Sequence, residues 1–166
     1  MFTKRHSFHD YKLSSAVEYA YHAVAIDEQR RYFQPALWEK EPKDVQQTME
    51  QVWFVGVHCD VGGGYIAAGL SDIALKWMTD KAMQAGLGLK QLEIQPDFMQ
   101  TSGNSRTGFY RLIPPYQRKI DQQIEGTGKE SCETLHLSVL ERYQNDKTYR
   151  PQNLVDYLRC NKQDLW

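Results

Sequence analysis

The sequence predicts an α/β protein with a parallel sheet, and three consecutive features carry this prediction. Residues 51–58 form a nearly continuous run of apolar, β-branched and aromatic side chains, which is typical of a strand buried on both faces. A glycine-rich turn follows over residues 59–64. Residues 71–86 then hold apolar side chains at helical spacing, with Ser71 and Asp72 able to cap the start and Gly86 able to end the helix. Strand, turn and helix in this order make one α/β unit.

The segment before the strand reads as an extended entry followed by a helix. Residues 1–13 lack periodicity, and Ser15 and Glu18 have the spacing of a capping box. Val17, Tyr21 and Val24 then form an apolar stripe at helical period. We therefore expect a helix that runs to about residue 27, followed by a loop that contains two prolines.

The rest of the chain predicts a long loop and two short helices. Residues 91–128 are rich in polar residues, proline and glycine, which indicates a loop or a partly disordered insertion. Residues 134–143 and 154–158 have helical patterns. We divide one domain into its main α/β part (1–90), the insertion (91–130) and a C-terminal helix and strap (131–166).

One convincing strand is too few for a parallel sheet. A strand of this type needs neighbours on both sides, because otherwise its backbone donors and acceptors stay unpaired. We therefore expect its partners to lie upstream of Met1, so that the chain is a truncated part of a larger fold.

Composition excludes several classes of protein. The 166 residues carry 20 basic and 21 acidic side chains, a net charge of -1, without the concentrated basic face that nucleic-acid binding requires. The three cysteines, Cys59, Cys132 and Cys160, form no CxxC pair and suggest reduced thiols in a cytosolic setting. The sequence shows no signal peptide and no transmembrane segment. We expect a cytoplasmic location in the producing cell, with export, if any, independent of a signal peptide.

The candidate catalytic residue is His58, at the end of the predicted strand. Functional sites of open α/β sheets lie outside the carboxyl ends of the strands. A histidine there can take a proton from a serine nucleophile and return it to the leaving group. Asp60 could hold His58, although forming the turn is its favoured role. Gly62, Gly63 and Gly64 would let a substrate approach the backbone closely. The alternative is a structural His58 that ends a buried strand.

A metal-binding interpretation is weaker. It would use His58, Cys59 and Asp60, with His6 and His9, but this spacing matches no structural zinc motif. The glycine triplet is not a phosphate-binding loop either, because no Gly-Lys-Ser/Thr follows it.

Other polar residues favour structural roles. We expect Asp27, Glu28 and Arg30 to pair with one another or to cap neighbouring groups, and His22 and His136 to be packing residues.

Residues 54–65, Phe-Val-Gly-Val-His-Cys-Asp-Val-Gly-Gly-Gly-Tyr, resemble a characteristic block of an uncharacterised α/β-hydrolase family that includes the phospholipase effectors of bacterial type VI secretion. The family more often has serine where this chain has Cys59. Four further stretches agree in the same order: residues 8–10, 19–30, 69–78, and 136–139 with 149–154.

This resemblance implies the C-terminal portion of an α/β-hydrolase fold and ester hydrolysis by a Ser-His-Asp triad. It implies that His58 is the catalytic base, with a phospholipid or related lipid ester as the substrate. No metal or organic cofactor is implied. A secretion apparatus and an immunity protein are the further partners that the resemblance suggests.

The family's serine lies in a Gly-x-Ser-x-Gly elbow, and its acid lies in a Trp-Asp-Thr-Val-like stretch; neither occurs here. Residues 103–107 resemble an elbow only superficially, because no strand precedes Ser105 and the second glycine is missing. Ser71 is better explained as a helix cap. We therefore expect this chain to contribute the histidine loop while the serine and acid lie upstream. The alternative is a catalytically inert fragment or interaction module.

Overall fold

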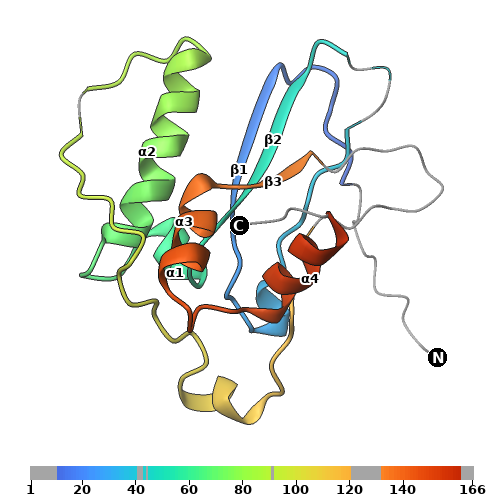
Figure 1. Ribbon diagram of the computed structural model, residues 1–166. Coiled ribbons are helices and arrows are strands. Elements are labelled where there is room, and N and C mark those ends of the chain that lie inside the picture. The colour runs from blue at the N-terminus through green and yellow to red at the C-terminus, as the bar shows by residue number, and fades with distance from the viewer. Residues whose placement is uncertain (1–10, 41–42, 44, 91, 121–131, 162–166) are drawn as a thin grey trace, which may run out of the picture.

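The computed structural model describes residues 11–40, 43, 45–90, 92–120 and 132–161. Its centre is a parallel sheet in the order β1-β2-β3, formed by β1 (Tyr19–Ala25), β2 (Thr48–Phe54) and β3 (Glu133–Leu135) (Figure 1). The predicted α/β class with a parallel sheet is confirmed. Over the described residues no helix is long and apolar enough to cross a membrane.

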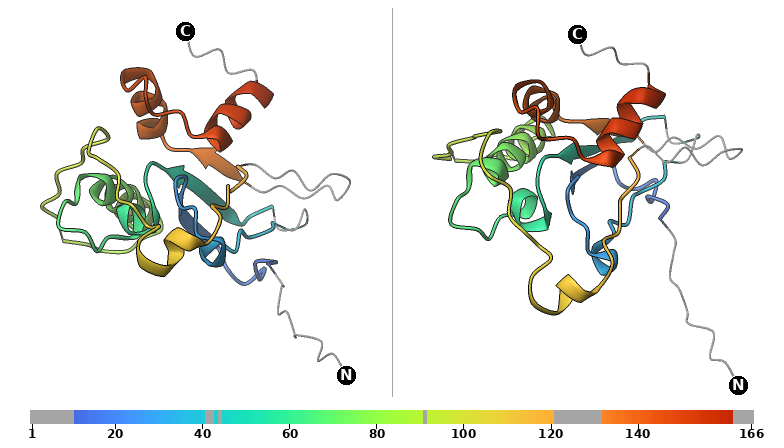
Figure 2. Two further views of the ribbon diagram at one scale, coloured as in Figure 1. Left: turned by 90° about the horizontal axis from the view of Figure 1, so that it is seen from below. Right: turned by 60° about the horizontal axis from the view of Figure 1, so that its bottom comes forward.

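Helices lie around this sheet. They are α1 (His58–Gly62), α2 (Gly69–Gln84), α3 (Leu137–Asn145) and α4 (Gln152–Cys160), with the 3-10 turns η1 (Arg31–Phe33) and η2 (Gly108–Leu112). In Figure 2, α1 and α2 lie to one side of the sheet, and α3 and α4 lie near β3. The β1 edge therefore faces away from α3 and α4.

The prediction of a helix that ends near residue 27 is wrong. Its second half is β1, whose seven residues pair in parallel with β2 from Tyr19↔Thr48 to Ala25↔Phe54. Ala20, Val24 and Ala25 are buried by this pairing. Alanine and the helical spacing favour a helix locally, but the tertiary contact with β2 overrides that preference.

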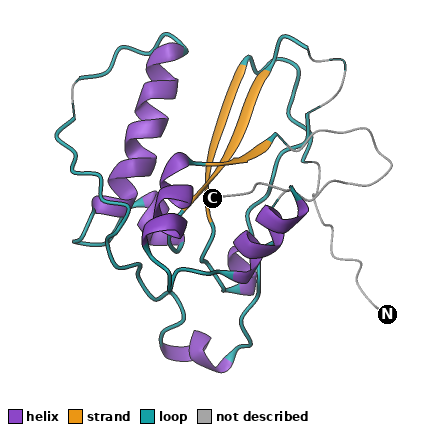
Figure 3. Ribbon diagram, in the orientation of Figure 1, coloured by secondary structure: helices purple, strands orange, loops and turns teal. Residues whose placement is uncertain are grey.

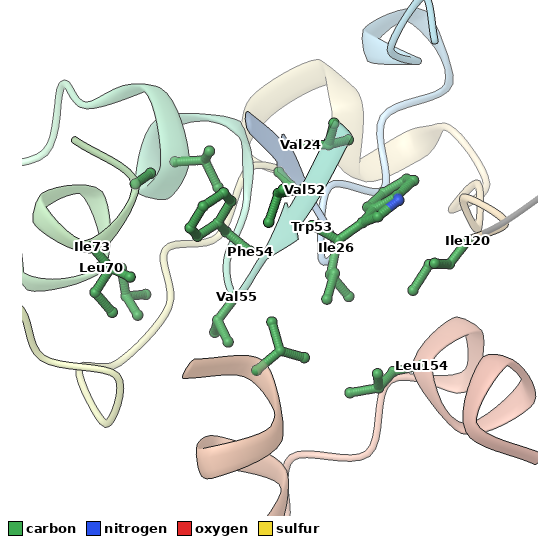
Figure 4. Packing of buried hydrophobic residues seen from close by; sticks show 14 of the residues in the cluster. Val24, Ile26, Val52, Trp53, Phe54, Val55, Leu70, Ile73, Ile120 and Leu154 are labelled. Atoms are coloured by element: carbon green, nitrogen blue, oxygen red, sulfur yellow. The ribbon is translucent and has the colours of Figure 1, made fainter. Parts of the chain in front are cut away.

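The central position of β2 corrects a second expectation. Its neighbours β1 and β3 both come from the described part of this chain, so the partners predicted upstream of Met1 are not needed for β2. The burial on both faces is confirmed, since Trp53 and Phe54 are 0% and 1% exposed. Figure 4 shows Phe54 pointing toward Leu70 and Ile73 of α2, whereas Trp53 points toward Ile120.

Within the described residues β1 and β3 are the two edge strands of the sheet. Thr48 donates its N–H to the Glu18 carbonyl, and Ile26 donates its N–H to the Phe54 carbonyl. The backbone N–H and C=O groups of the even-numbered residues of β1 therefore point toward β2. The backbone groups of Tyr21 and Ala23 consequently point away from the sheet. In the described part of the chain no other strand pairs with this edge.

The predicted helix after the glycine turn is confirmed as α2, although it begins two residues earlier than Ser71. The Ser71 hydroxyl donates to the Ala68 carbonyl and does not cap the helix. Gly86 follows the helix with φ of 93°, a conformation that glycine adopts without strain.

The C-terminal predictions are confirmed in part. Within residues 92–120 the regular structure is η2, and long loops run on both sides of it (Figure 3). Residues 121–131 lie outside the described part. The helix expected from residue 134 begins at Leu137, because residues 133–135 form β3 instead. The helical piece at 154–158 is confirmed within the longer α4.

Candidate active site

His58 is not the last residue of the strand, as the sequence predicted, but the first residue of α1. The strand ends at Phe54, and Gly56 turns the chain with φ of 106°. A Cβ atom at Gly56 would lie 2.4 Å from the Cβ of Asp60, a contact that cannot be tolerated without rearrangement. Glycine is therefore required here for both its conformation and its size. The turn leaves His58 exposed at the carboxyl end of β2.

Asp60 holds the turn and the loop that packs against it. Its buried carboxylate accepts hydrogen bonds at Oδ2 from the Val57 N–H (2.9 Å), the Ser102 hydroxyl (2.8 Å) and the Gly103 N–H (2.9 Å). These partners place Asp60 in the turn role, the more common of the two roles considered. It joins the His58 turn to a loop more than 40 residues further along the chain.

The three glycines after Asp60 leave space beside His58. Gly62 ends α1, and Gly63 and Gly64 follow with φ of 84° and 115°. A Cβ atom at Gly62 or Gly63 would meet no other atom within 4 Å. Gly62 and Gly63 line the same cavity as His58, so no side chain from these two residues narrows the cavity there.

A carboxylate from β1's carboxyl end anchors the backbone of His58. Glu28, which is 1% exposed, accepts the His58 N–H at 3.3 Å and the Ser105 hydroxyl at 2.8 Å. The Arg30 guanidinium donates to both carboxylate oxygens, at 3.0 and 2.8 Å. The pairing of Glu28 with Arg30 was expected, but the contacts with His58 and Ser105 were not.

Glu28 is charged in this site. Burial alone would raise the pKa of its carboxyl, but the hydrogen bonds from Arg30 and Ser105 outweigh burial and lower the pKa to about 2. The Glu28 carboxylate beside the backbone of His58 is therefore charged at neutral pH.

Asp27 fastens the same turn from the other side. Its Oδ2 accepts the Gly56 N–H at 2.7 Å and the Tyr149 hydroxyl at 3.0 Å. Burial raises the pKa of Asp27, and burial together with the nearby Asp27 carboxylate raises the pKa of the Tyr149 hydroxyl. Consecutive acidic residues thus hold the two ends of the turn, Asp27 at Gly56 and Glu28 at His58.

His58 lines a cavity of about 520 Å³ together with residues of β1. Its ring lies edge-on to the Phe33 ring, with centroids 5.5 Å apart. The cavity walls are largely apolar and come from β1, from η1 and the two residues after it, and from α1 and α2. Its lining includes Ala23, Val24, Phe33, Pro35, Val61, Ala74, Leu75 and Met78.

A buried cation closes the end of this cavity. Arg118 donates to the Ala25 carbonyl at 2.7 Å and to the Phe33 carbonyl. It is 5% exposed, and burial lowers its pKa to about 10. Arg118 thereby satisfies the last outward-facing carbonyl of β1, while the preceding part of that edge stays open.

The other histidines have structural partners. His22 contacts Gln51 at 3.2 Å and packs against the Trp38 ring, and burial lowers its pKa. His136 accepts the Ser138 N–H at the start of α3 and stacks on Phe54. The packing roles expected for both are confirmed.

The metal interpretation gains no support from this geometry. Asp60 is engaged by the turn, and among the residues that the structure describes no three His, Cys, Asp or Glu side chains form a metal-binding group. His6 and His9, which that interpretation also used, lie outside the described residues.

Serine hydroxyls near the site are bonded elsewhere. Ser71 donates to the Ala68 carbonyl, Ser102 to Asp60 and Ser105 to Glu28. Within the described ranges no serine hydroxyl is hydrogen-bonded to the His58 ring.

These observations define a mixed α/β protein with a histidine-bearing turn at the carboxyl end of a parallel sheet. Residues 1–81 match the family described as "T6SS, Phospholipase effector Tle1-like, catalytic domain". This stretch holds β1, β2, α1 and most of α2, and the match supports a family of type VI secretion phospholipase effectors. The resemblance found in the sequence is thereby confirmed. No curated protein sequence and no solved structure matches the chain significantly.

Proposed function

We propose that this chain supplies the catalytic histidine, His58, of a serine hydrolase that cleaves phospholipids or related lipid esters. The observation that carries the proposal is the exposed His58 at the wall of a largely apolar cavity, on a turn fixed by Glu28 and Asp60. The family of residues 1–81 supports a phospholipid substrate. The three strands and their helices are the C-terminal portion of an α/β-hydrolase fold in this proposal.

In the proposed reaction His58 works as general base and then as general acid. Its imidazole takes the proton from a serine hydroxyl as the serine oxygen attacks the ester carbonyl. The tetrahedral intermediate collapses, the bond to the alcohol breaks, and the imidazolium gives its proton to the leaving oxygen. Water then repeats the sequence to release the fatty acid and regenerate the serine. Backbone N–H groups near the serine stabilise the oxyanion.

The serine and the acid come from a segment outside this chain in the same proposal. The open edge of β1 supports it, because the backbone groups of Tyr21 and Ala23 have no strand partner in the described part of the chain. A parallel strand added there would end at the same side of the sheet as β2. It would bring its carboxyl-terminal residues close to His58.

The effector context gives further proposals. We propose that the protein is made in the cytoplasm, leaves the cell through the type VI apparatus without a signal peptide, and is neutralised by an immunity protein. His58 and the added serine and acid form the reacting groups, so this scheme uses no metal or organic cofactor.

The test is reassembly of the hydrolase. The chain is co-expressed with the reading frame that precedes the codon of Met1, provided that this frame encodes a Gly-x-Ser-x-Gly elbow, and release of fatty acid from phosphatidylglycerol and phosphatidylethanolamine is measured. We expect hydrolysis only when both parts are present. His58→Ala should lower the rate by about 10³-fold or more, as loss of a triad member does. The control is His136→Ala, a histidine outside the cavity, which should retain activity if the variant folds.

The second candidate is a catalytically inert interaction module. It is favoured by the absence, among the described residues, of a serine hydroxyl bonded to His58. It predicts an upstream frame without an elbow serine, or a reassembled protein that releases no fatty acid from any lipid. Either result would replace the hydrolase proposal.

A further inference from the structure

We propose that η1 and η2 form a docking surface for an anionic phospholipid bilayer. The surface consists of Arg31 and Tyr32 on η1 and of Phe109, Arg111 and Leu112 on η2, and we call it the basic-aromatic face. Tyr32, Phe109 and Leu112 are 79%, 74% and 81% exposed. Arg31 and Arg111, which adjoin Tyr32 and Leu112 in the sequence, are exposed as well. Large apolar side chains with this exposure mark interaction sites when they gather in one region.

The two turns lie side by side although they are far apart in the sequence. The rings of Phe33 and Tyr110 contact each other with centroids 6.1 Å apart. The Arg30 guanidinium lies 3.5 Å from the Phe33 centroid and 5.2 Å from that of Tyr110. Figures 1 and 2 show η2 standing out from the body at the end of the sheet where β2 leads into α1.

Hydrogen bonds within residues 106–113 hold η2 in an ordered conformation. The Arg106 guanidinium donates to the Ile113 carbonyl at 2.8 Å, and the Ile113 N–H donates to the Tyr110 carbonyl at 3.3 Å. These bonds close the turn internally and direct Phe109 and Leu112 outward. The exposure of the two apolar side chains therefore belongs to an ordered turn.

The excess of basic residues around η1 and η2 favours an anionic partner. The loops 29–36 and 103–120 together contain six Arg or Lys and no Asp or Glu, in a chain with a net charge of -1. Glu28 pairs with Arg30, Arg118 is buried, and Arg106 is half-buried on the Ile113 carbonyl, which leaves Arg31, Arg111 and Lys119 as the exposed cations of the six. Basic residues attract the anionic surface of a bilayer, and aromatic and aliphatic side chains insert at its interface.

The basic-aromatic face lies near the His58 cavity, so docking there would bring the cavity to the bilayer; this role of docking rests on the proposed function. The Phe33 ring, which contacts η2 through Tyr110, also contacts the His58 ring. A bilayer bound at η1 and η2 would therefore lie close to the entrance of the His58 cavity. A lipid could pass from the bilayer to the catalytic histidine over a short distance.

The test measures binding without catalysis. The 166-residue chain is sedimented with vesicles of ether-linked phosphatidylglycerol or of ether-linked phosphatidylcholine, neither of which has a cleavable acyl ester. We expect binding to phosphatidylglycerol that exceeds binding to phosphatidylcholine by about tenfold or more and weakens as salt rises. Phe109→Ser combined with Leu112→Ser should lower affinity at least about tenfold. Arg31→Gln combined with Arg111→Gln should remove most of the preference for the anionic lipid.

The matched control is Val45→Ser, because Val45 is 77% exposed in the turn that precedes β2, outside the basic-aromatic face. It should bind as the unchanged chain does. The proposal is overturned by equal loss of binding in this control, by unchanged binding in the Phe109/Leu112 variant, or by equal binding to both lipids. Failure of the unchanged chain to bind any vesicle also overturns it and would point to another protein segment as the partner. None of these results depends on hydrolysis, so the proposed function stands or falls separately.

Discussion

At the scale of single residues, Glu28 organises the candidate site. It joins β1 to the backbone of His58 and to Ser105, across 30 and 77 residues of sequence. The Arg30 guanidinium bonds to both oxygens of Glu28, and its positive charge offsets the cost of burying the carboxylate. Removing the charge of Glu28 should therefore loosen the turn that presents His58.

Glu28→Gln should lower the free energy of unfolding by about 1 to 3 kcal/mol at pH 7, because the charged hydrogen bonds to Arg30 and Ser105 are lost. Since folding lowers the pKa of Glu28 from 4.5 to about 2, its stabilisation is complete above pH 4.5 and disappears as the pH falls toward 2. Urea denaturation at pH 7 and at pH 3 measures both effects. The difference between the two proteins should shrink at pH 3, and a constant difference would contradict this assignment.

The sequence predicted some of these residue roles and missed others. His58 beside a glycine-rich turn, the turn role of Asp60 and the Glu28–Arg30 pair follow from local pattern. The contact of Glu28 with His58 does not, because it depends on the parallel pairing of β1 with β2. The catalytic role of His58 stays a prediction at both levels.

At the scale of elements, the chain that follows β2 explains why His58 lies where it does. Gly56 must have a positive φ and must leave room for Asp60. The sequence showed the glycines but extended the strand to residue 58, because Val55 and Val57 continue the apolar run. The segment of β1 was predicted as a helix because a short apolar segment can fit both the helical period and the strand period. Only its long-range pairing with β2 decides between a helix and a strand.

Gly56→Ala should destabilise the protein by about 2 to 4 kcal/mol, because the new Cβ meets Asp60 and the backbone is strained. Gly86→Ala is the matched control, since Gly86 also has a positive φ but a Cβ there would meet nothing within 4 Å. It should cost only about 1 kcal/mol. Urea denaturation of both variants separates steric conflict from backbone strain. Equal losses would show that the contact with Asp60 is not the cause.

At the scale of the whole molecule, the sheet has two edge strands, β1 and β3, within the described residues. β2 has partners on both sides, β3 lies beside α3 and α4, and residues of β1 line the His58 cavity. The sequence predicted that residues 51–58 lack strand partners in this chain, but β2 has a partner on each side, and the edge strands among the described residues are β1 and β3. Unpaired edges bind further strands readily.

Hydrogen exchange should reveal this edge in the isolated chain. We expect the amides of Tyr21 and Ala23 to exchange quickly, because they point away from β2. The Val24 and Ile26 amides, which face β2, should exchange much more slowly. The measurement is amide exchange followed by NMR. Equal protection of all four amides would contradict an open β1 edge.

The most direct test of the central claim, that His58 activates a serine supplied by another segment, is labelling with a fluorophosphonate. Intact mass is measured for the chain alone, for the chain co-expressed with the upstream segment, and for the second sample with His58→Ala. We predict no adduct on the chain alone and one adduct on the upstream segment that disappears with His58→Ala. An adduct on the chain alone, lost in Ser105→Ala, would contradict the claim and assign the nucleophile to Ser105.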